Sequence, residues 1–260
     1  MNIDDIINDS AFHDWQNYAP NIVQYLKYTK DSQYLLAVGH KIEDVYRAFC
    51  NARASLIYAN SSDFGDIAGD ENIDKLYAKY HFLLNSIMEY ALCLDISWQV
   101  VWAYTQTESL DYLIQQNFCQ IEKDCNRDSV LERLNYIISQ HAPGFSKIQA
   151  ILSIVTDFDN NPNTIKLRSI NNKIKHRGTI HFEGLGTNYT NLPIVVNGKK
   201  IPILHRDHYA VNDIENMLFE YHNNFQVYIN GLIDIMMPSD YLNEKIDLKE
   251  GLNSLLHLSN

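Results

Sequence analysis

IDKLYAKYHFLLNSIMEYALCLDISWQVVWAY, residues 73–104, constrains the architecture more strongly than any other segment. Its apolar side chains recur every three or four residues, the spacing of one helix face: Leu76, Tyr80, Leu84, Ile87, Ala91, Leu94, Trp98 and Val101. Residues 91–102 are apolar on several faces, so we expect this helix to be the most buried element. Asp95 lies in that apolar stretch and needs a partner, because an isolated buried carboxylate is costly. We expect a side chain of a neighbouring helix or a tyrosine hydroxyl to satisfy Asp95, and we favour this role over a catalytic one.

The same spacing predicts further helices on both sides. They cover residues 31–59, 111–123, 129–140, 146–156 and 212–237, with one or two short helices in residues 1–28. Ser129 with Glu132, and Asn212 with Glu215, have the spacing of helix-capping pairs. After residue 178 the period becomes that of strands, and Asn197-Gly198 predicts a hairpin. We therefore predict an all-α fold, an antiparallel bundle of long helices with a small β-hairpin insertion near residues 179–205. It forms a single domain, 1–260, with a C-terminal tail at 239–260.

Composition favours a protein that is not bound to a membrane. The 260 residues are 46% hydrophobic and 20% charged, which suffices for a sizeable core. The first ten residues are acidic where a secretory signal is basic and then apolar. The most apolar window, 90–104, is too short to span a bilayer. Four cysteines show no CxxC pair, so reduced thiols are expected. We expect a cytoplasmic protein.

Charge is unevenly distributed along the chain. The net charge is −11, but residues 160–206 hold eight basic side chains and one acidic one, a balance of +7 that leaves −18 elsewhere. A basic island on an acidic body suits selective contact with a phosphate-bearing ligand. It is equally compatible with pairing to acidic surface of the same chain or of a second subunit.

The basic island contains a predicted helix, NTIKLRSINNKIKHRG, residues 163–178. Leu167, Ile170 and Ile174 form one narrow apolar stripe at about 100° per residue. A polar arc facing away from the stripe consists of Arg168, Asn172, Lys175 and His176. Asn163 or Thr164 can cap the start, and Gly178 can end the helix in the left-handed conformation.

The long paired helices, the Trp-containing segment YHFLLNSIMEYALCLDISWQVVWAY and the late segment RSINNKIKHRGTIHFEG together resemble the HEPN superfamily, in particular a bacterial branch with a small hairpin after the motif helix. The resemblance covers about residues 30–235. It implies a homodimer of helical bundles and a metal-independent ribonuclease of a toxin–antitoxin or phage-defence system, with a cognate antitoxin protein as a partner.

The family signature is an Arg followed by four to six residues and then a His. His176 matches the histidine, whereas seven residues separate Arg168 from it, so Arg168 matches only by sharing its helical face. This departure bears on ribonuclease activity more than on the fold.

The residues can be assigned roles from their chemistry. RNA cleavage needs a base, an acid and positive charge at the phosphorane, and histidine serves as acid or base near neutral pH. We assign catalysis to His176, Arg168 and Asn172, and nucleic-acid binding to Lys173, Lys175 and Arg177. RNA or a nucleotide is the expected ligand, and no cofactor is required.

Two alternatives remain open. The chain can be a non-catalytic helical dimer with a regulatory or interaction role, which the missing Arg at the usual position favours. A metal-dependent hydrolase can instead use the imidazoles and carboxylates near the hairpin, which are His176, His181, Glu183, His205, Asp207 and His208. No HExxH or equivalent spacing is present, so we expect no metal site.

Overall fold

The computed structural model describes residues 3–29, 32–65, 68–69, 71–106, 115–141, 144–178, 180–185, 194–201 and 208–242. These residues are mostly helical, as predicted. The helices are α1 (Ile3–Asn8), the 3₁₀ helix η1 (His13–Tyr18), α2 (Ile22–Tyr28), α3 (Gln33–Ala59), α4 (Asn72–Tyr104), α5 (Gln115–Asp124), α6 (Arg127–Ser139), α7 (Phe145–Asp159), α8 (Pro162–Arg177) and α9 (Val211–Met236). The strands are β1 (His181–Phe182), β2 (Ile194–Val196), β3 (Lys199–Ile201) and β4 (His208–Tyr209).

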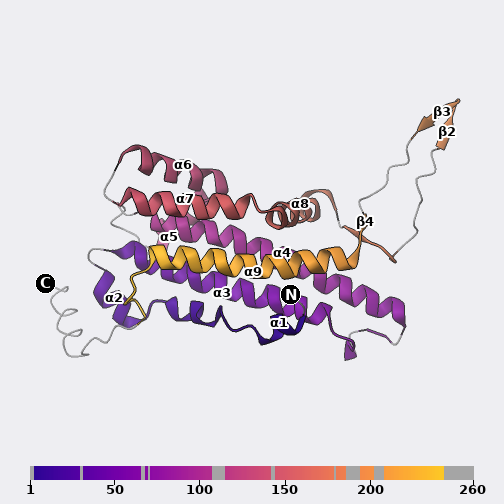
Figure 1. Ribbon diagram of the computed structural model, residues 1–260, viewed down its shortest axis with the longest axis horizontal. Coiled ribbons are helices and arrows are strands. Elements are labelled where there is room, and N and C mark those ends of the chain that lie inside the picture. The colour runs from indigo at the N-terminus through magenta and orange to yellow at the C-terminus, as the bar shows by residue number, and fades with distance from the viewer. Residues whose placement is uncertain are drawn as a thin grey trace.

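The long helices pack lengthwise against one another. Helix α3 packs along α4, and α9 packs against both α4 and α7. Figure 1 shows these four helices running across the view, whereas α8 is seen nearly along its axis. Helix α8 therefore crosses the others, and it contacts α4, α7 and α9. Its different flanks consequently meet different neighbours.

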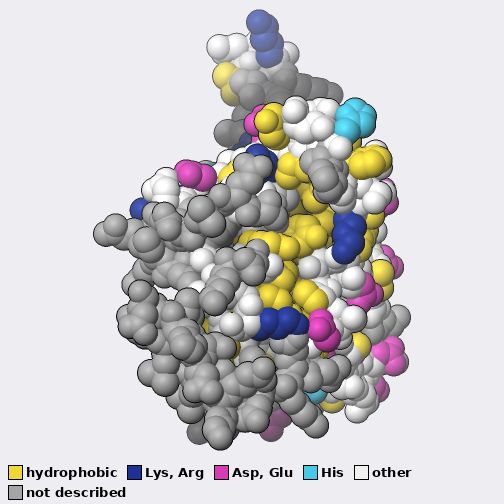
Figure 2. Space-filling view, turned by 90° about the vertical axis from the view of Figure 1, so that its left-hand side faces the viewer, with side chains coloured by type: hydrophobic (Ala, Val, Ile, Leu, Met, Phe, Trp, Pro, Cys, Tyr) yellow, Lys and Arg dark blue, Asp and Glu magenta, His cyan; other side chains and the backbone are white. Residues whose placement is uncertain are grey.

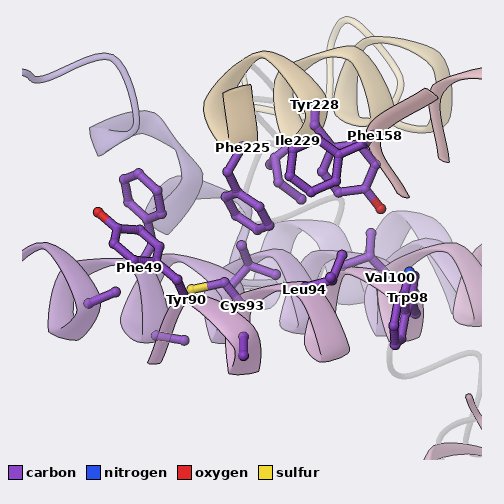
Figure 3. Close-up of a cluster of buried hydrophobic side chains, with 14 of the residues drawn as sticks. Phe49, Tyr90, Cys93, Leu94, Trp98, Val100, Phe158, Phe225, Tyr228 and Ile229 are labelled. Carbon is purple, nitrogen blue, oxygen red and sulfur yellow. The ribbon is translucent and has the colours of Figure 1, made fainter. Parts of the chain in front are cut away.

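Aromatic side chains from four helices form the centre of the core (Figure 3). The ring of Phe225 in α9 lies 5.7 Å from that of Phe49 in α3 and 5.8 Å from that of Phe158 in α7. Phe158 also stacks on Tyr228, with ring centroids 4.3 Å apart. Burying each such side chain contributes roughly 1.5–3 kcal/mol. The predicted central helix has one buried face, on which Tyr90, Leu94 and Val101 are at most 1% exposed, but Leu92, in the stretch expected to be apolar on several faces, is 44% exposed.

A hydrogen-bonded polar chain crosses this core. The Oη of Tyr90 lies 2.7 Å from Nδ1 of His222, and Nε2 of His222 lies 2.9 Å from Oδ2 of Asp9. A carboxylate only accepts hydrogen bonds, which favours a proton on Nε2 and donation from Tyr90 to Nδ1; the amide nitrogen of Gln226 also lies 2.8 Å from Nε2. Burial lowers the pKa of His222 to about 4, and the attraction of Asp9 for the imidazolium only partly opposes this effect. The imidazole is therefore neutral at physiological pH.

Two predicted helix caps were wrong. Helix α6 begins earlier than expected, because Asn126 and Ser129 bond reciprocally through their side chains and backbone N–H groups, each at 2.9 Å. Helix α9 begins after Ala210, which provides no side-chain cap bond. Glu215 does not act as a capping partner there, since it is buried and forms an ion pair with Lys79 of α4 at 2.7 Å.

The predicted hairpin is present, and a second strand pair was not foreseen. Strands β2 and β3 pair antiparallel, and Asn197 and Gly198 have φ values of 50° and 74°, as a two-residue hairpin turn requires. Strands β1 and β4 pair in parallel, with His181 opposite His208. Residues 186–193, 202–207 and the predicted tail beyond residue 242 lie outside the described residues. Within the described helices, none combines the length and apolar character needed to cross a membrane.

Candidate functional site

The cap of helix α8 lies two residues before Asn163, the first of the two predicted caps. Asn161 is the cap, and its Oδ1 accepts the N–H of Asn163 at 2.9 Å, with Pro162 in the first turn. The expected caps have other roles, because the Asn163 amide donates to Glu220 of α9 at 2.6 Å and Thr164 is buried. This docking fixes the start of α8 against α9.

The predicted apolar stripe of α8 faces the core. Leu167 and Ile170 are buried, and Ile174 packs against the core from the edge. His176 follows Leu167 by nine residues, which places it about 180° around the helix. It is exposed. Gly178 ends the helix with φ 105° and ψ 178°, a positive φ as predicted but in a region that essentially only glycine occupies.

One flank of α8 packs against α4 and carries two of the predicted cations. Lys175 Nζ lies 3.8 Å from Oδ2 of Asp95, and the Arg168 guanidinium carbon lies 5.1 Å from the ring centre of Trp98. Burial raises the pKa of Asp95, while the charges of Lys175 and Arg168 oppose that rise. A neighbouring helix therefore supplies the partner expected for Asp95, but the Asp95 side chain is 47% exposed and not buried as predicted. Part of the basic island thus pairs with an acidic group of the same chain.

The opposite flank of α8 carries Lys173. Its Nζ donates to Oη of Tyr209 at 3.0 Å and lies 5.6 Å from the centre of that ring. Lys173 and Lys175 are about 200° apart around the helix, so they do not act on one phosphate from one side. Asn172 and His176 occupy the exposed arc between these flanks, and Arg177 is exposed in the last turn. The structure thus brings Arg168, Asn172, Lys175 and His176 to one side and separates Lys173 from them.

The end of the molecule far from the hairpin differs from the end of α8 in the arrangement of its basic side chains. Figure 2 shows the end of the molecule opposite the hairpin side of Figure 1, where a strip of hydrophobic side chains crosses the coloured surface. Lys and Arg side chains appear there singly and next to acidic ones. Among the described residues, the last turn of α8 instead places Lys175, His176 and Arg177 in succession, all exposed.

The described part of the chain does not bring together enough ligand side chains for the metal site of the second alternative. No group of three His, Cys, Asp or Glu side chains there can hold an ion. His181 and His208 are neighbours across β1 and β4, with ring centroids 5.7 Å apart. His205 and Asp207 lie outside the described residues.

A pocket beside α4 was not predicted. It has a volume of about 450 Å³ and lies between α4 and residues 180–185. Its lining residues are Tyr77, Tyr80, His81, Leu84, Ile180, His181, Phe182 and Leu185. The spacing of Tyr77, His81 and Leu84 places them on one flank of α4, which sequence reasoning could have noted. No local sequence pattern indicates that residues 180–185 pack over this flank of α4.

No protein-family model, curated protein or solved structure matches this chain. Its function has to be inferred from the residues themselves.

Proposed function

We propose that this protein is an HEPN-like RNA- or nucleotide-binding protein that acts as a metal-independent endoribonuclease. The observation that supports this proposal most is the exposed last turn of α8, where Lys175, His176 and Arg177 follow one another on a chain of net charge −11. Such a local concentration of positive charge attracts a phosphate more selectively than a uniformly basic surface does.

Cleavage by internal transfer requires three functions from these side chains. The 2′-hydroxyl attacks the adjacent phosphorus after losing its proton, and the 5′-oxygen leaves after gaining one. His176 performs one proton transfer, while Lys175, which lies on the same side of α8, neutralises the charge that develops on the phosphorane. Asn172 precedes His176 by one turn and is exposed, so it can orient the imidazole or the ribose.

A second copy of the chain completes this proposed site. One imidazole does not serve both sides of the scissile phosphate at once, whereas a two-fold dimer brings two α8 helices to one cleft. We infer that α3, α4, α7 and α9 form the antiparallel bundle of an HEPN core spanning about residues 30–235. In a toxin–antitoxin or phage-defence system, a cognate antitoxin protein would then act by covering the exposed face of α8.

The geometry of Arg168 favours a second candidate, a non-catalytic helical dimer with a regulatory or interaction role. Its guanidinium stacks on Trp98, and its position lies outside the family spacing. A guanidinium stacked on an aromatic ring keeps its charge and can bind a phosphate of a ligand without any reaction following. This candidate predicts RNA or nucleotide binding with no turnover.

The two candidates are separated by incubating the purified protein with single-stranded RNA in EDTA. The endoribonuclease proposal predicts cleavage that falls at least about a hundredfold in His176→Ala. His141→Ala, which removes an exposed imidazole after α6, should retain full cleavage. Circular dichroism checks that both variants keep the helical signal. Binding without cleavage in the wild type would favour the non-catalytic dimer, and neither binding nor cleavage would refute the endoribonuclease proposal.

A further inference from the structure

We propose that the pocket between α4 and residues 180–185 binds an unpaired base of an RNA strand whose phosphates lie along the end of α8. This inference rests on the proposed RNA-binding function and names a second contact for the same ligand. The pocket volume of about 450 Å³ lies in the range of small-molecule sites. Its residues play no part in the cleavage chemistry assigned to α8.

The wall of the pocket is aromatic and firmly held. Phe182 stacks on Tyr80 with ring centroids 4.3 Å apart, and both residues are buried. The Tyr80 hydroxyl donates to the backbone oxygen of Glu183 at 2.6 Å, which ties residues 180–185 to α4. Because these contacts hold residues 180–185 against α4, the pocket is formed before a ligand binds.

The rim of the pocket offers a ring for stacking. Tyr77 lines the pocket, yet 58% of its surface is exposed. An exposed aromatic ring beside a preformed apolar wall is the arrangement that single-strand-binding proteins use to hold bases. Each stacked base contributes about 1–3 kcal/mol in such proteins, whatever its sequence.

The polar groups of the pocket match the edge of a heterocycle. Among the described lining residues, His81 and His181 carry the imidazoles, and none carries a carboxylate or an ammonium group. Asn85 Nδ2 lies 3.1 Å from Nε2 of His81, so that nitrogen accepts and Nδ1 is left to donate. Nε2 of His181 is buried and has no hydrogen-bond partner among the described residues. An uncharged ring with a hydrogen-bond acceptor on its edge suits this lining better than an ion or an aliphatic chain does.

The spacing along the chain shows how far the pocket lies from the basic residues of α8. Ile180 follows Arg177 by three residues, so their Cα atoms are at most about 11 Å apart. Asp95, the partner of Lys175, follows His81 by fourteen residues, or about 21 Å along α4. A nucleotide in the pocket therefore lies close to Arg177, whereas the Lys175–Asp95 pair lies farther along α4. Only a strand of several nucleotides covers both, so affinity should rise with strand length.

Binding of labelled single-stranded RNA, measured by fluorescence anisotropy on strands of increasing length, tests this inference. Tyr77→Ala should weaken binding about tenfold, which corresponds to one lost stacking contact. Leu84→Trp, which fills the pocket instead of emptying its rim, should weaken binding similarly. Tyr58→Ala is the matched control, because Tyr58 is also 58% exposed but lies on α3 outside the pocket. Thermal unfolding checks that all variants fold.

The outcomes separate this inference from the proposed function. Wild-type affinity in both pocket variants, together with weaker binding in Lys175→Ala, would overturn the base pocket and leave RNA binding at α8 intact. If the wild type binds no RNA, adenosine monophosphate is titrated and followed by NMR. Binding that depends on Tyr77 would then support the pocket while refuting the RNA function, and no binding would overturn both.

Discussion

Acid should weaken this fold through one buried imidazole, that of His222. The side chain is inaccessible to solvent, stacks on Phe49 at 4.6 Å and bonds to both Tyr90 and Asp9. Protonating it would place a hydrogen on Nδ1, against the donating hydroxyl of Tyr90. Burial is the largest cause of its low pKa, and the nearby carboxylate of Asp9 does not offset it.

The sign and size of the effect follow from the two pKa values. The pKa of His222 is about 4 in the folded protein and 6.5 without the fold. Between those values the unfolded chain binds more protons, so the free energy of unfolding falls as pH falls. The full loss is about 3 kcal/mol below pH 4, of which about 2.5 kcal/mol is reached by pH 4.5. The pKa of Asp9 is also lowered, so its own contribution is lost only at still lower pH.

Urea unfolding followed by circular dichroism at several pH values measures this effect. His222→Gln should be less stable than the wild type at neutral pH, because it loses a packed ring. The difference between the two should then shrink by about 2.5 kcal/mol from pH 7 to pH 4.5. His141→Gln, which removes an exposed imidazole, should follow the wild type throughout. A constant difference between wild type and His222→Gln across this range would refute the reasoning.

Three further predictions concern α8 and its contact with α4. Asn161→Ala removes the helix cap and should lower the free energy of unfolding in urea by about 1 kcal/mol. Gly178→Ala forces a side chain into a strained conformation, with an expected cost of about 1–3 kcal/mol in thermal unfolding. Asp95→Asn releases Lys175 from its ion pair and should tighten RNA binding by up to about fivefold, whereas Asp157→Asn, the same charge change on an exposed carboxylate of α7, should leave it unchanged.

The long helices were predictable because their apolar repeats persist over many turns. The helix predicted at residues 31–59 corresponds to α3, Gln33–Ala59, and the helix predicted at 73–104 corresponds to α4, Asn72–Tyr104. Helix starts were less predictable, because several polar residues near each start compete for the cap. Asn126 outcompeted Ser129 in this way. The parallel pairing of β1 with β4 joins residues 27 positions apart, and no local pattern indicates it.

The side chains of the candidate site were predictable, but their neighbours were not. Periodicity identified the buried stripe and the exposed arc of α8 correctly. The direction in which α8 crosses the other helices decides that Lys175 meets Asp95 and that Lys173 meets Tyr209. That direction depends on contacts between segments far apart in the sequence. The pocket was missed for the same reason, since residues 180–185 fold back onto the first half of α4.

The position of His222 in the core determines how a pH profile of cleavage should be interpreted. Domains of this kind are stable by roughly 5–15 kcal/mol, so a loss of about 3 kcal/mol leaves most molecules folded. A decline in cleavage between pH 7 and pH 5 would therefore reflect groups on the α8 face rather than unfolding. His222→Gln checks this separation, because it removes the core titration while leaving α8 unchanged. A decline that moves in His222→Gln would instead show that the core and the α8 face are coupled through α9, which contacts both α4 and α8.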